Sequence, residues 1–372
     1  MNETNATTAL EDFYFYDDKS APAYLDGFET MVGVVPRVVY LGVIYFILIF
    51  GLIGNVSVLF LMHNRDFQNL SYPVYVRTLG VVDSIFLITV CIEDILDHQF
   101  KKMNEFMTSS VAFCKIWSFA LNVTRLLSPW LIVSLTCDRF VAVVFPLKRA
   151  VLCSRRTALI TCSMIVGLVL GESLFYAILS RPVMNEEDFE LECDLAMRGS
   201  VLNYVMFRAL FHETTLPCTV ILFLNIGIII TVRRSLKFRA ATGSKQPGKE
   251  KSSSMDKVTL SLTAVSLMAF ICLLPISLLQ VIEYSWFDEM ENYEEHLERQ
   301  INITEEELQR MNDLHVRAYK IGNYWPLLNL FFLVNFGQNF YVMIITGPKY
   351  RQVFERIQKK NNNSSSSSSS SS

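Results

Sequence analysis

The sequence predicts an all-α membrane protein built as a bundle of seven transmembrane helices. Hydrophobic residues make up 51% of the 372 residues and charged residues only 19%, whereas globular domains carry about 25% charged residues. The apolar residues gather in stretches long enough to cross the roughly 30 Å hydrocarbon core of a bilayer. These stretches are apolar all round rather than along one stripe. The seven stretches run over 37–62, 73–96, 111–144, 157–180, 203–232, 258–282 and 318–345.

The basic residues predict the orientation of this bundle. Loops 146–156 and 233–257 and the tail after residue 345 are rich in Lys and Arg, whereas residues 1–36 and the segment after the sixth stretch are acidic. Basic loops stay on the cytoplasmic side, and an odd number of spans separates the two termini. We therefore expect a multi-pass plasma-membrane protein with an extracellular N-terminus and a cytoplasmic C-terminus.

The outer side carries three expected glycosylation sites, and no cleavable signal peptide is visible. Residues 1–36 lack a basic start and an apolar core, so the first span is expected to serve as the insertion signal. The Asn-x-Ser/Thr acceptors on the outer side are Asn2, Asn5 and Asn302. The same tripeptides at Asn55 and Asn122 lie inside spans and are expected to stay unmodified.

The third span carries a thiol at one end and an acid–base pair at the other. Twenty-five residues separate Cys114 from Arg139, which corresponds to about 37 Å along a helix. The segments Ser134–Phe140 and Val141–Leu147 resemble the inner end of the third helix in rhodopsin-like (class A) G-protein-coupled receptors. That family usually has Asp-Arg-Tyr where this chain has Asp138-Arg139-Phe140.

The resemblance implies a two-state receptor for a heterotrimeric G protein. An outer ligand binds one state better, and the inner end of span six then swings away from Arg139. In many members an acid at the base of span six holds this arginine at rest. Here Met255 occupies that place and Asp256 follows it, so Asp138 is the expected local partner. The expected G-protein-coupling residues are Asp138, Arg139, Phe140, Asn339 and Met343.

Three departures from the family pattern keep alternatives open. Leu273 replaces the usual Trp of span six, and Asn225 and Met343 replace tyrosines that support the active state. A receptor-like protein that binds ligand or scaffolds partners without activating G proteins is therefore one alternative. A transporter or channel is another, although the sequence shows no internal repeat.

Two of the eight cysteines are expected to form a disulfide. Cys114 begins span three and Cys193 lies in the polar loop 181–202, both on the oxidising side. The receptor family carries this bridge. Two free thiols are the alternative.

Asp83 in span two marks a polar core. A buried carboxylate is costly unless it is paired or neutralised. In the family this acid binds a sodium ion with polar groups of spans three and seven, and the matching residues here are Ser128, Asn335 and Asn339. The alternative is a protonated Asp83 hydrogen-bonded to Asn55 and Asn339. No other cofactor is expected.

Arg125 stands near mid-membrane, where an unpaired guanidinium is costly. Glu213 and Glu172 are its candidate partners, and the pair is either a structural staple or a receiver for an anionic ligand group. The acids at the outer end of span two either anchor the helix end or accept a cationic group. The candidate pocket residues are Glu93, Asp94, Asp97, Asn122, Arg125, Glu172, Arg208, His212, Glu213, Gln280 and Glu283.

The ligand is expected to be an extracellular peptide. Leu121 occupies the position of the amine-binding Asp of this family, and Leu333 that of the retinal-binding Lys, which argues against both ligand classes. The long outer loop 283–316 is strongly acidic, with helical periodicity around 294–311, and an acidic rim attracts cationic ligands. The chain resembles invertebrate neuropeptide receptors, including the FMRFamide-like group.

The cytoplasmic end is expected to contact lipid and regulatory proteins. Residues 346–360 form an amphipathic segment typical of a membrane-surface helix, and residues 361–372 are a disordered Asn/Ser tail. Receptor kinases and arrestin are further expected partners. No nucleophile elbow, metal-spaced cluster or phosphate loop indicates an enzyme, and nothing indicates nucleic-acid binding.

Overall fold

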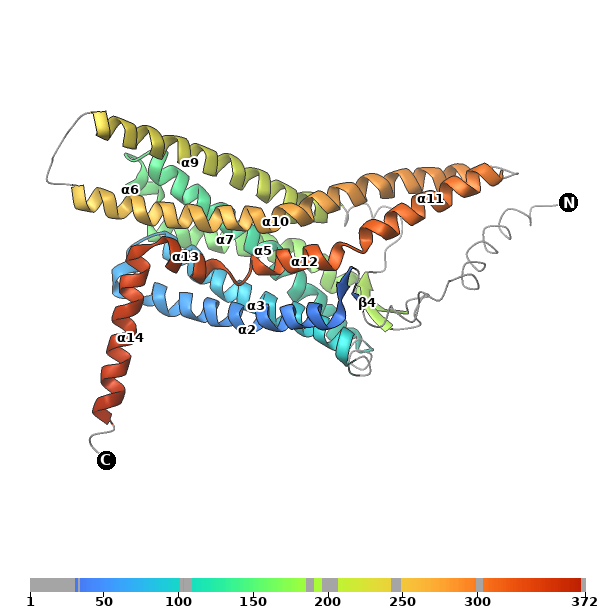
Figure 1. The fold of residues 1–372 in the computed structure, drawn as a ribbon, viewed down its shortest axis with the longest axis horizontal. Helices are drawn as coiled ribbons and strands as arrows, with labels where there is room; N and C mark the ends of the chain where they lie inside the picture. Colours follow the sequence, from blue (N-terminus) through green and yellow to red (C-terminus); the bar gives the residue numbers. More distant parts are fainter. Residues whose placement is uncertain are drawn as a thin grey trace. The chain divides into compact units, whose positions relative to one another are not determined.

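The computed structural model describes residues 31–32, 34–100, 103, 109–184, 191–195, 207–241, 249–298 and 304–368, most of them helical (Figure 1). The chain forms two compact units. The first comprises Met1–Ile44 and Pro275–Phe331, and the second comprises Tyr45–Leu274 and Phe332–Ser372. The glycosylation sites predicted at Asn2, Asn5 and Asn302 lie outside the described residues.

Helix α5 (Val111–Val144) is the centre of the second unit. It packs against α3 (Tyr72–Gln99), α7 (Arg155–Leu179) and α9 (Leu216–Ala241). Serine caps fix where two of these helices begin. Ser110 Oγ accepts the Phe113 N–H of α5 at 3.4 Å, and Ser154 Oγ accepts the Thr157 N–H of α7 at 3.1 Å. Such caps satisfy backbone donors that have no partner inside the helix.

The first span is α2 (Arg37–His63). The short helices η2 (Arg65–Phe67) and α6 (Arg149–Leu152) lie in the connections after α2 and α5. Strands β1 (Met31–Val32) and β2 (Val35–Pro36) pair before α2, and β3 (Ser180–Met184) pairs with β4 (Leu191–Leu195) after α7.

The fifth span contains a π-helix. Segment η3 (Ala209–Thr215) has this wider winding and leads directly into α9. Pro217 follows it, and a proline has no N–H for the carbonyl four residues back, against which its ring also clashes. That carbonyl belongs to Glu213, inside η3. The wider turn relieves this conflict, and such segments are frequent at functional sites.

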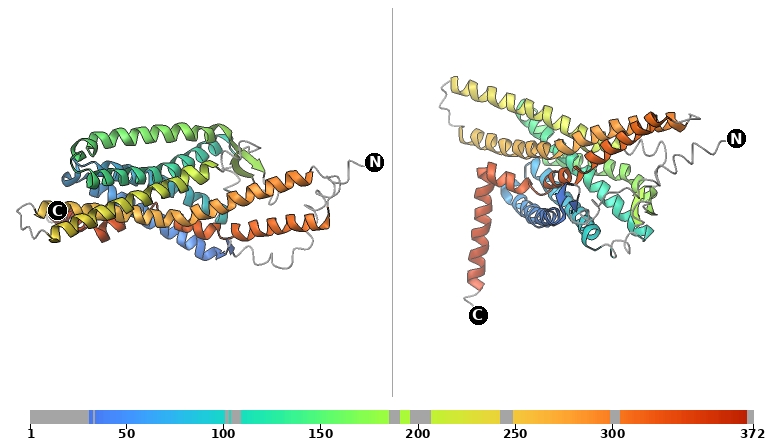
Figure 2. Two further views of the ribbon diagram at one scale, coloured as in Figure 1. Left: turned by 90° about the horizontal axis from the view of Figure 1, so that it is seen from above. Right: turned by 45° about the vertical axis from the view of Figure 1, so that its right-hand side comes forward.

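The sixth helix is far longer than the predicted span 258–282. Helix α10 runs from Lys249 to Glu298, and α11 (Glu305–Gly322) runs back beside its C-terminal part (Figures 1 and 2). The predicted loop 283–316 is therefore largely helical. The sequence contains no Gly or Pro from 283 to 321 to end a helix. The Tyr293 hydroxyl donates to the Glu307 carbonyl at 3.3 Å, and the Arg310 guanidinium lies 5.0 Å from the Tyr293 ring.

The seventh span is broken rather than continuous. The segments Lys320–Val334 and Asn339–Thr346 meet at 54°, and they contain α12 (Trp325–Val334) and α13 (Asn339–Thr346). The Asn55 amide donates to the Phe336 carbonyl at 2.9 Å, which satisfies a backbone group freed by the break. A Cβ on Gly337 would lie 2.8 Å from Gly51 Cα, so the two backbones touch at the break.

Helix α14 (Pro348–Ser368) follows α13 and extends beyond the predicted amphipathic segment 346–360. The prediction of a disordered tail over 361–372 is wrong as far as Ser368. Asn and Ser have middling helix propensity and do not break a helix as Gly or Pro does.

Among the described residues, five helices are long and apolar enough to cross a membrane, and the bent pair makes a sixth. Helix α3 is as long, at 28 residues, but carries Arg77, Asp83, Glu93 and Asp94 among its apolar side chains. The five segments are Arg37–His63, Val111–Val144, Arg155–Leu179, Leu210–Ser235 and Lys257–Glu283.

Candidate functional site

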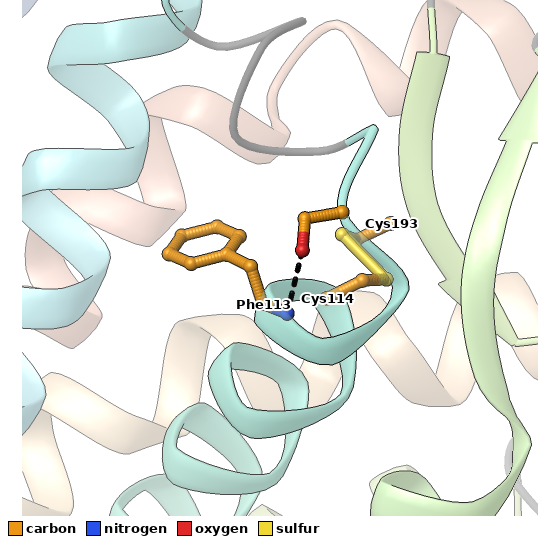
Figure 3. Close-up of a disulfide and its surroundings, with 4 residues drawn as sticks. Phe113, Cys114 and Cys193 are labelled. Carbon is orange, nitrogen blue, oxygen red and sulfur yellow. Dashed lines mark hydrogen bonds between the residues drawn. A yellow bond between two sulfur atoms is a disulfide. The ribbon is translucent and has the colours of Figure 1, made fainter.

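A disulfide ties the first turn of α5 to the β3–β4 hairpin. Cys114 and Cys193 are bonded, with their Cα atoms 5.4 Å apart (Figure 3). Cys193 lies on β4 opposite Pro182 of β3. The predicted bridge is confirmed, and the alternative of two free thiols is wrong.

Arg208 is the centre of a buried ionic cluster and is only 1% exposed. Its Nε donates to Glu172 Oε1 at 2.9 Å, and its Nη1 donates to Glu213 Oε1 at 2.9 Å. The same Nη1 donates to the Tyr176 hydroxyl at 2.6 Å and to Asn122 Oδ1 at 3.3 Å. The guanidinium lies 4.7 Å from the Tyr176 ring centre. Two carboxylates, a phenol and an amide thus surround one cation.

The π-helix explains why Arg208 meets Glu213. Residues five apart do not face each other on an α-helix, but the i to i+5 hydrogen bonding of a π-helix brings them together. The sequence, taken as α-helical, instead places Arg208 over His212. His212 Nδ1 lies 3.1 Å from Glu172 Oε1, and the Trp130 indole donates to its carbonyl at 3.1 Å.

Arg125 is attached to this cluster more loosely. Its Nε lies 3.2 Å from Glu213 Oε2, without the alignment of a hydrogen bond, and its guanidinium lies 5.3 Å from the Phe332 ring centre. Of its two candidate partners Glu213 is the one found. The other expectation is wrong, because Glu172 binds Arg208 and His212. Tyr176 had no sequence signal, since a single Tyr in an apolar span carries no pattern.

The remaining pocket candidates lie elsewhere. Glu93 and Asp94 are half-buried near the C-terminal end of α3, and the side chain of Asp97 lies outside the described residues. Gln280 and Glu283 are on α10, in the first compact unit. These residues therefore stay candidates.

Asp83 is the centre of a second buried cluster. Its Oδ1 accepts the Ser128 hydroxyl at 2.6 Å, and its Oδ2 accepts the Asn339 amide at 2.9 Å. Asn335 is fully buried, and neither its amide oxygen nor its nitrogen has a hydrogen-bond partner among the described residues. The oxygens of Asp83, Ser128 and Asn335 are ligands of the kind hard cations prefer. Of the two hydrogen bonds in the alternative for Asp83, the one with Asn339 is present. The one with Asn55 is not, because the Asn55 amide donates to the Phe336 carbonyl at the helix break.

Arg139 forms a third cluster at the opposite end of α5 from Cys114. It is 4% exposed and donates from Nε and Nη2 to the carboxylate of its neighbour Asp138. Ser71 Oγ donates to the same carboxylate at 2.9 Å and accepts from Arg139 Nη2 at 3.2 Å. The guanidinium lies 5.0 Å from the Tyr72 ring centre. The expected local partner Asp138 is thus in contact, while the side chains of Met255 and Asp256 lie outside the described residues.

Aromatic and small side chains pack around this cluster. The Tyr72 ring contacts Tyr350 of α14, with centroids 6.4 Å apart, and Phe67 contacts both rings. Phe140 packs directly on α9, where a Cβ on Gly227 would lie 2.6 Å from its ring. The expected coupling residue Met343 is fully buried.

Residues 54–305 match the model of a family described as "7 transmembrane receptor (rhodopsin family)". Similar proteins include "Probable G-protein coupled receptor B0563.6" of Caenorhabditis elegans, 21% identical over 258 residues, which are 66% of this chain and 58% of that protein. "Probable G-protein coupled receptor 132" of Homo sapiens is 25% identical over 180 residues, 48% of this chain and 42% of the relative. The "Apelin receptor" of Xenopus tropicalis is 24% identical over 205 residues, 53% and 51% of the two chains.

The chain therefore spans about half the length of these relatives, from 42% to 58%. The family match covers well over half of the chain. It confirms the predicted seven-helix membrane fold and the expectation that the protein is not an enzyme. With the disulfide of α5 and the paired Asp138 and Arg139 at its other end, this chain belongs to the rhodopsin family of seven-transmembrane receptors.

Proposed function

We propose that this chain is a cell-surface G-protein-coupled receptor with an extracellular N-terminus. An extracellular peptide activates it, and movement of α10 passes the signal to a heterotrimeric G protein. The observation that carries the proposal is the state of Arg139. It is a buried cation at the end of a spanning helix, next to the basic loop 146–156, and its carboxylate partner is its own neighbour on α5.

The mechanism needs only a small change at this cluster. Asp138 travels with Arg139 on α5, so α10 can move without leaving the guanidinium unpaired. A ligand shifts the equilibrium by as much as its affinities for the two states differ. Two of the relatives are named as G-protein-coupled receptors, which supports this assignment.

Guanine-nucleotide exchange on purified G proteins tests the proposal. The receptor in membranes is challenged with a pooled peptide library, and Arg139→Ala is compared with the wild type and with Arg351→Ala, which removes an exposed arginine of α14. We expect Arg139→Ala to lose stimulated and basal exchange at normal surface expression, with Arg351→Ala unaffected. Undiminished exchange by Arg139→Ala counts against the proposal.

The second candidate function is a receptor-like protein that binds ligand without activating G proteins. Three buried side chains favour it, because they fill the places of the family's Trp and tyrosines. Leu273 and Met343 are fully buried, and Asn225 accepts the Ser266 hydroxyl at 2.9 Å. If the wild type binds a labelled peptide without exchange, and the double variant Asn225→Tyr, Met343→Tyr gains exchange, this candidate replaces the first. Membership of a receptor family gives no support to a transporter or channel.

Two accessory proposals concern the ion and the tail. A sodium ion would be held by the oxygens of Asp83, Ser128 and Asn335, where it would stabilise the resting arrangement of the bundle. Receptor kinases and arrestin would act on the Ser run at the C-terminus, and the amphipathic start of α14 would lie on cytoplasmic lipid.

A further inference from the structure

Two arginines share the Glu213 carboxylate in the cluster around Arg208, called the outer cluster because the proposed orientation places it on the extracellular side, and they are bound very differently. Arg208 is 1% exposed, and two of its nitrogens donate to four surrounding oxygens. The Arg125 side chain is 31% exposed and makes one ion pair, 3.2 Å from Nε to Glu213 Oε2, besides its contact with the Phe332 ring. Its two terminal nitrogens donate to no residue that the structure describes. Arg208 is therefore surrounded by acceptors at two of its nitrogens, with only its buried Nη2 lacking a partner among the described residues, while both terminal nitrogens of Arg125 are open donors.

Two neighbours hold the Arg125 guanidinium. They are Glu213 of η3 and the ring of Phe332, which belongs to α12. One face is next to an aromatic ring and one edge is next to a carboxylate. The edge formed by the terminal nitrogens is left for a planar acceptor group, because a guanidinium donates in its own plane.

Charge balance decides what kind of acceptor fits. The two arginines and the two glutamates Glu172 and Glu213 sum to zero formal charge with His212 neutral. A ligand carboxylate would leave the cluster with a net negative charge at membrane depth, where uncompensated charge is costly. An uncharged carbonyl oxygen satisfies the open donors and keeps the balance.

We propose that Arg125 is a ligand-recognition residue that binds an uncharged carbonyl group of the ligand, an amide or an ester, while Arg208 is a structural cation. The ligand part next to this carbonyl lies against Phe332 and is apolar. The inference rests on the proposed function in one respect, that this cluster is the ligand site. The ligand group that reaches Arg125 is then an uncharged carbonyl and not an anion.

Binding of two matched probes tests the proposal without a G protein or a peptide. Phenylacetamide and phenylacetate share shape and ring and differ in charge. Their dissociation constants for the purified full chain in lipid nanodiscs are measured by ligand-observed NMR, with empty nanodiscs as the reference. We expect phenylacetamide to bind at least about tenfold more tightly than phenylacetate, which corresponds to about 1.4 kcal/mol.

Three variants assign the preference to Arg125. Arg125→Gln is expected to lose most of the phenylacetamide affinity. Arg351→Ala removes an exposed arginine of α14 instead, so it should leave the probe preference intact. If Arg125→Gln does not fold, Arg125→Lys replaces it, and the loss of the planar fork should reduce the preference at least about threefold.

Several results overturn the proposal. These are tighter or equal binding of phenylacetate, no binding of phenylacetamide up to its solubility, or a preference that Arg125→Gln and Arg125→Lys both retain. Because nucleotide exchange is not measured, a positive result stands even if the chain activates no G protein. A negative result likewise leaves the Arg139 experiment unaffected.

Discussion

Arg208 and Arg139 are both almost completely buried, but their counter-ions come from different places. Arg208 is bound by Glu172 of α7 and by Glu213 of η3, so its ion pairs join two spans. Arg139 is bound by Asp138, the preceding residue on the same helix, and by Ser71 and the face of Tyr72 at the start of α3. The ion pairs of Arg208 cross-link two spans, whereas the ion pair of Arg139 lies within a single helix.

Under the proposed function, the two arginines have different purposes: Arg208 joins spans, and Arg139 stays paired while a neighbouring helix moves. Separating Arg208 from its acids would leave buried charges unpaired, at a cost of about 3–5 kcal/mol. If a neighbouring helix moves past Arg139, Asp138 stays paired with it, because both residues are on α5. Because of this contrast, the outer cluster should resist rearrangement and the inner cluster should permit it.

The largest expected effect is the loss of Arg208. Arg208→Ala leaves Glu172 and Glu213 without their cation and should destabilise the protein by about 3–5 kcal/mol, or about 5 °C in thermal midpoint. The measurement is thermal unfolding in detergent at a fixed scan rate, with Arg139→Ala as the matched variant. If both variants shift the midpoint equally, the two arginines do not differ as described.

Loosening the inner cluster should raise basal signalling. Tyr350→Leu removes the ring that supports Tyr72, whose face lies against the Arg139 guanidinium. A cation–π contact is worth about 1 kcal/mol, so its loss should raise the active population and basal nucleotide exchange about fivefold. Tyr350→Phe keeps the ring and should stay at the wild-type level. Unchanged exchange in Tyr350→Leu would show that this aromatic contact does not restrain Arg139.

The Asp83 cluster should respond to sodium. The thermal midpoint is measured in choline chloride and in NaCl, each at about 100 mM, which is close to physiological ionic strength. Sodium should raise the midpoint by about 2–4 °C, because it binds the folded state preferentially. Asp83→Asn should abolish the shift. Ser84→Ala should keep it, because the Ser84 hydroxyl bonds to Gly80 of its own helix. A sodium shift that survives in Asp83→Asn would place the ion elsewhere.

The smallest expected effect is on the reactivity of Cys153, which reports on the inner cluster. Its thiol lies 3.3 Å from the Asp138 carbonyl oxygen, and burial together with the Asp138 charge raises its pKa to about 11. Since only the thiolate reacts, the thiol form predominates at neutral pH and alkylation by iodoacetamide is slow there. The rate should rise about tenfold per pH unit from pH 8 to 10, whereas an unperturbed thiol levels off above about pH 8.5.

Removing the nearby cation should slow this reaction further. Arg139 lowers the pKa of Cys153, so Arg139→Ala should raise that pKa and reduce the labelling rate, followed by mass spectrometry of the Cys153 peptide. Faster labelling in this variant would mean that the loop around Cys153 opens when Arg139 is lost.

The sequence predicted the spans best where the helices are apolar all round. The prediction 111–144 matches α5, and 37–62 differs from α2 by one residue at its end. The prediction of a loop over 283–316 failed, because acidic side chains were interpreted as a loop although they do not end α10. The break at Asn335–Gln338 was also missed, since the turn depends on the contact of Gly337 with Gly51 and on Asn55, which lie far apart in sequence.

The outer cluster was predicted in composition but not in pairing. Its acids, arginines and Asn122 were candidates because charged groups inside a span need partners. The pairing of Arg208 with Glu213 requires the π-helix, which an assumed period of 3.6 residues cannot give. At the inner end, Asp138 could be anticipated as an immediate neighbour, but Ser71 and Tyr72 had no pattern linking them to Arg139.

The contact between Gly51 and Gly337 limits how the seventh span moves. With no side chain between the two backbones, there is no rotamer to adjust and no methyl group to compress. A shift of the chain at this point towards α2 would therefore bring backbone against backbone. Any inward movement of the seventh span has to occur above or below this contact, and even an alanine at either position would push the two segments apart.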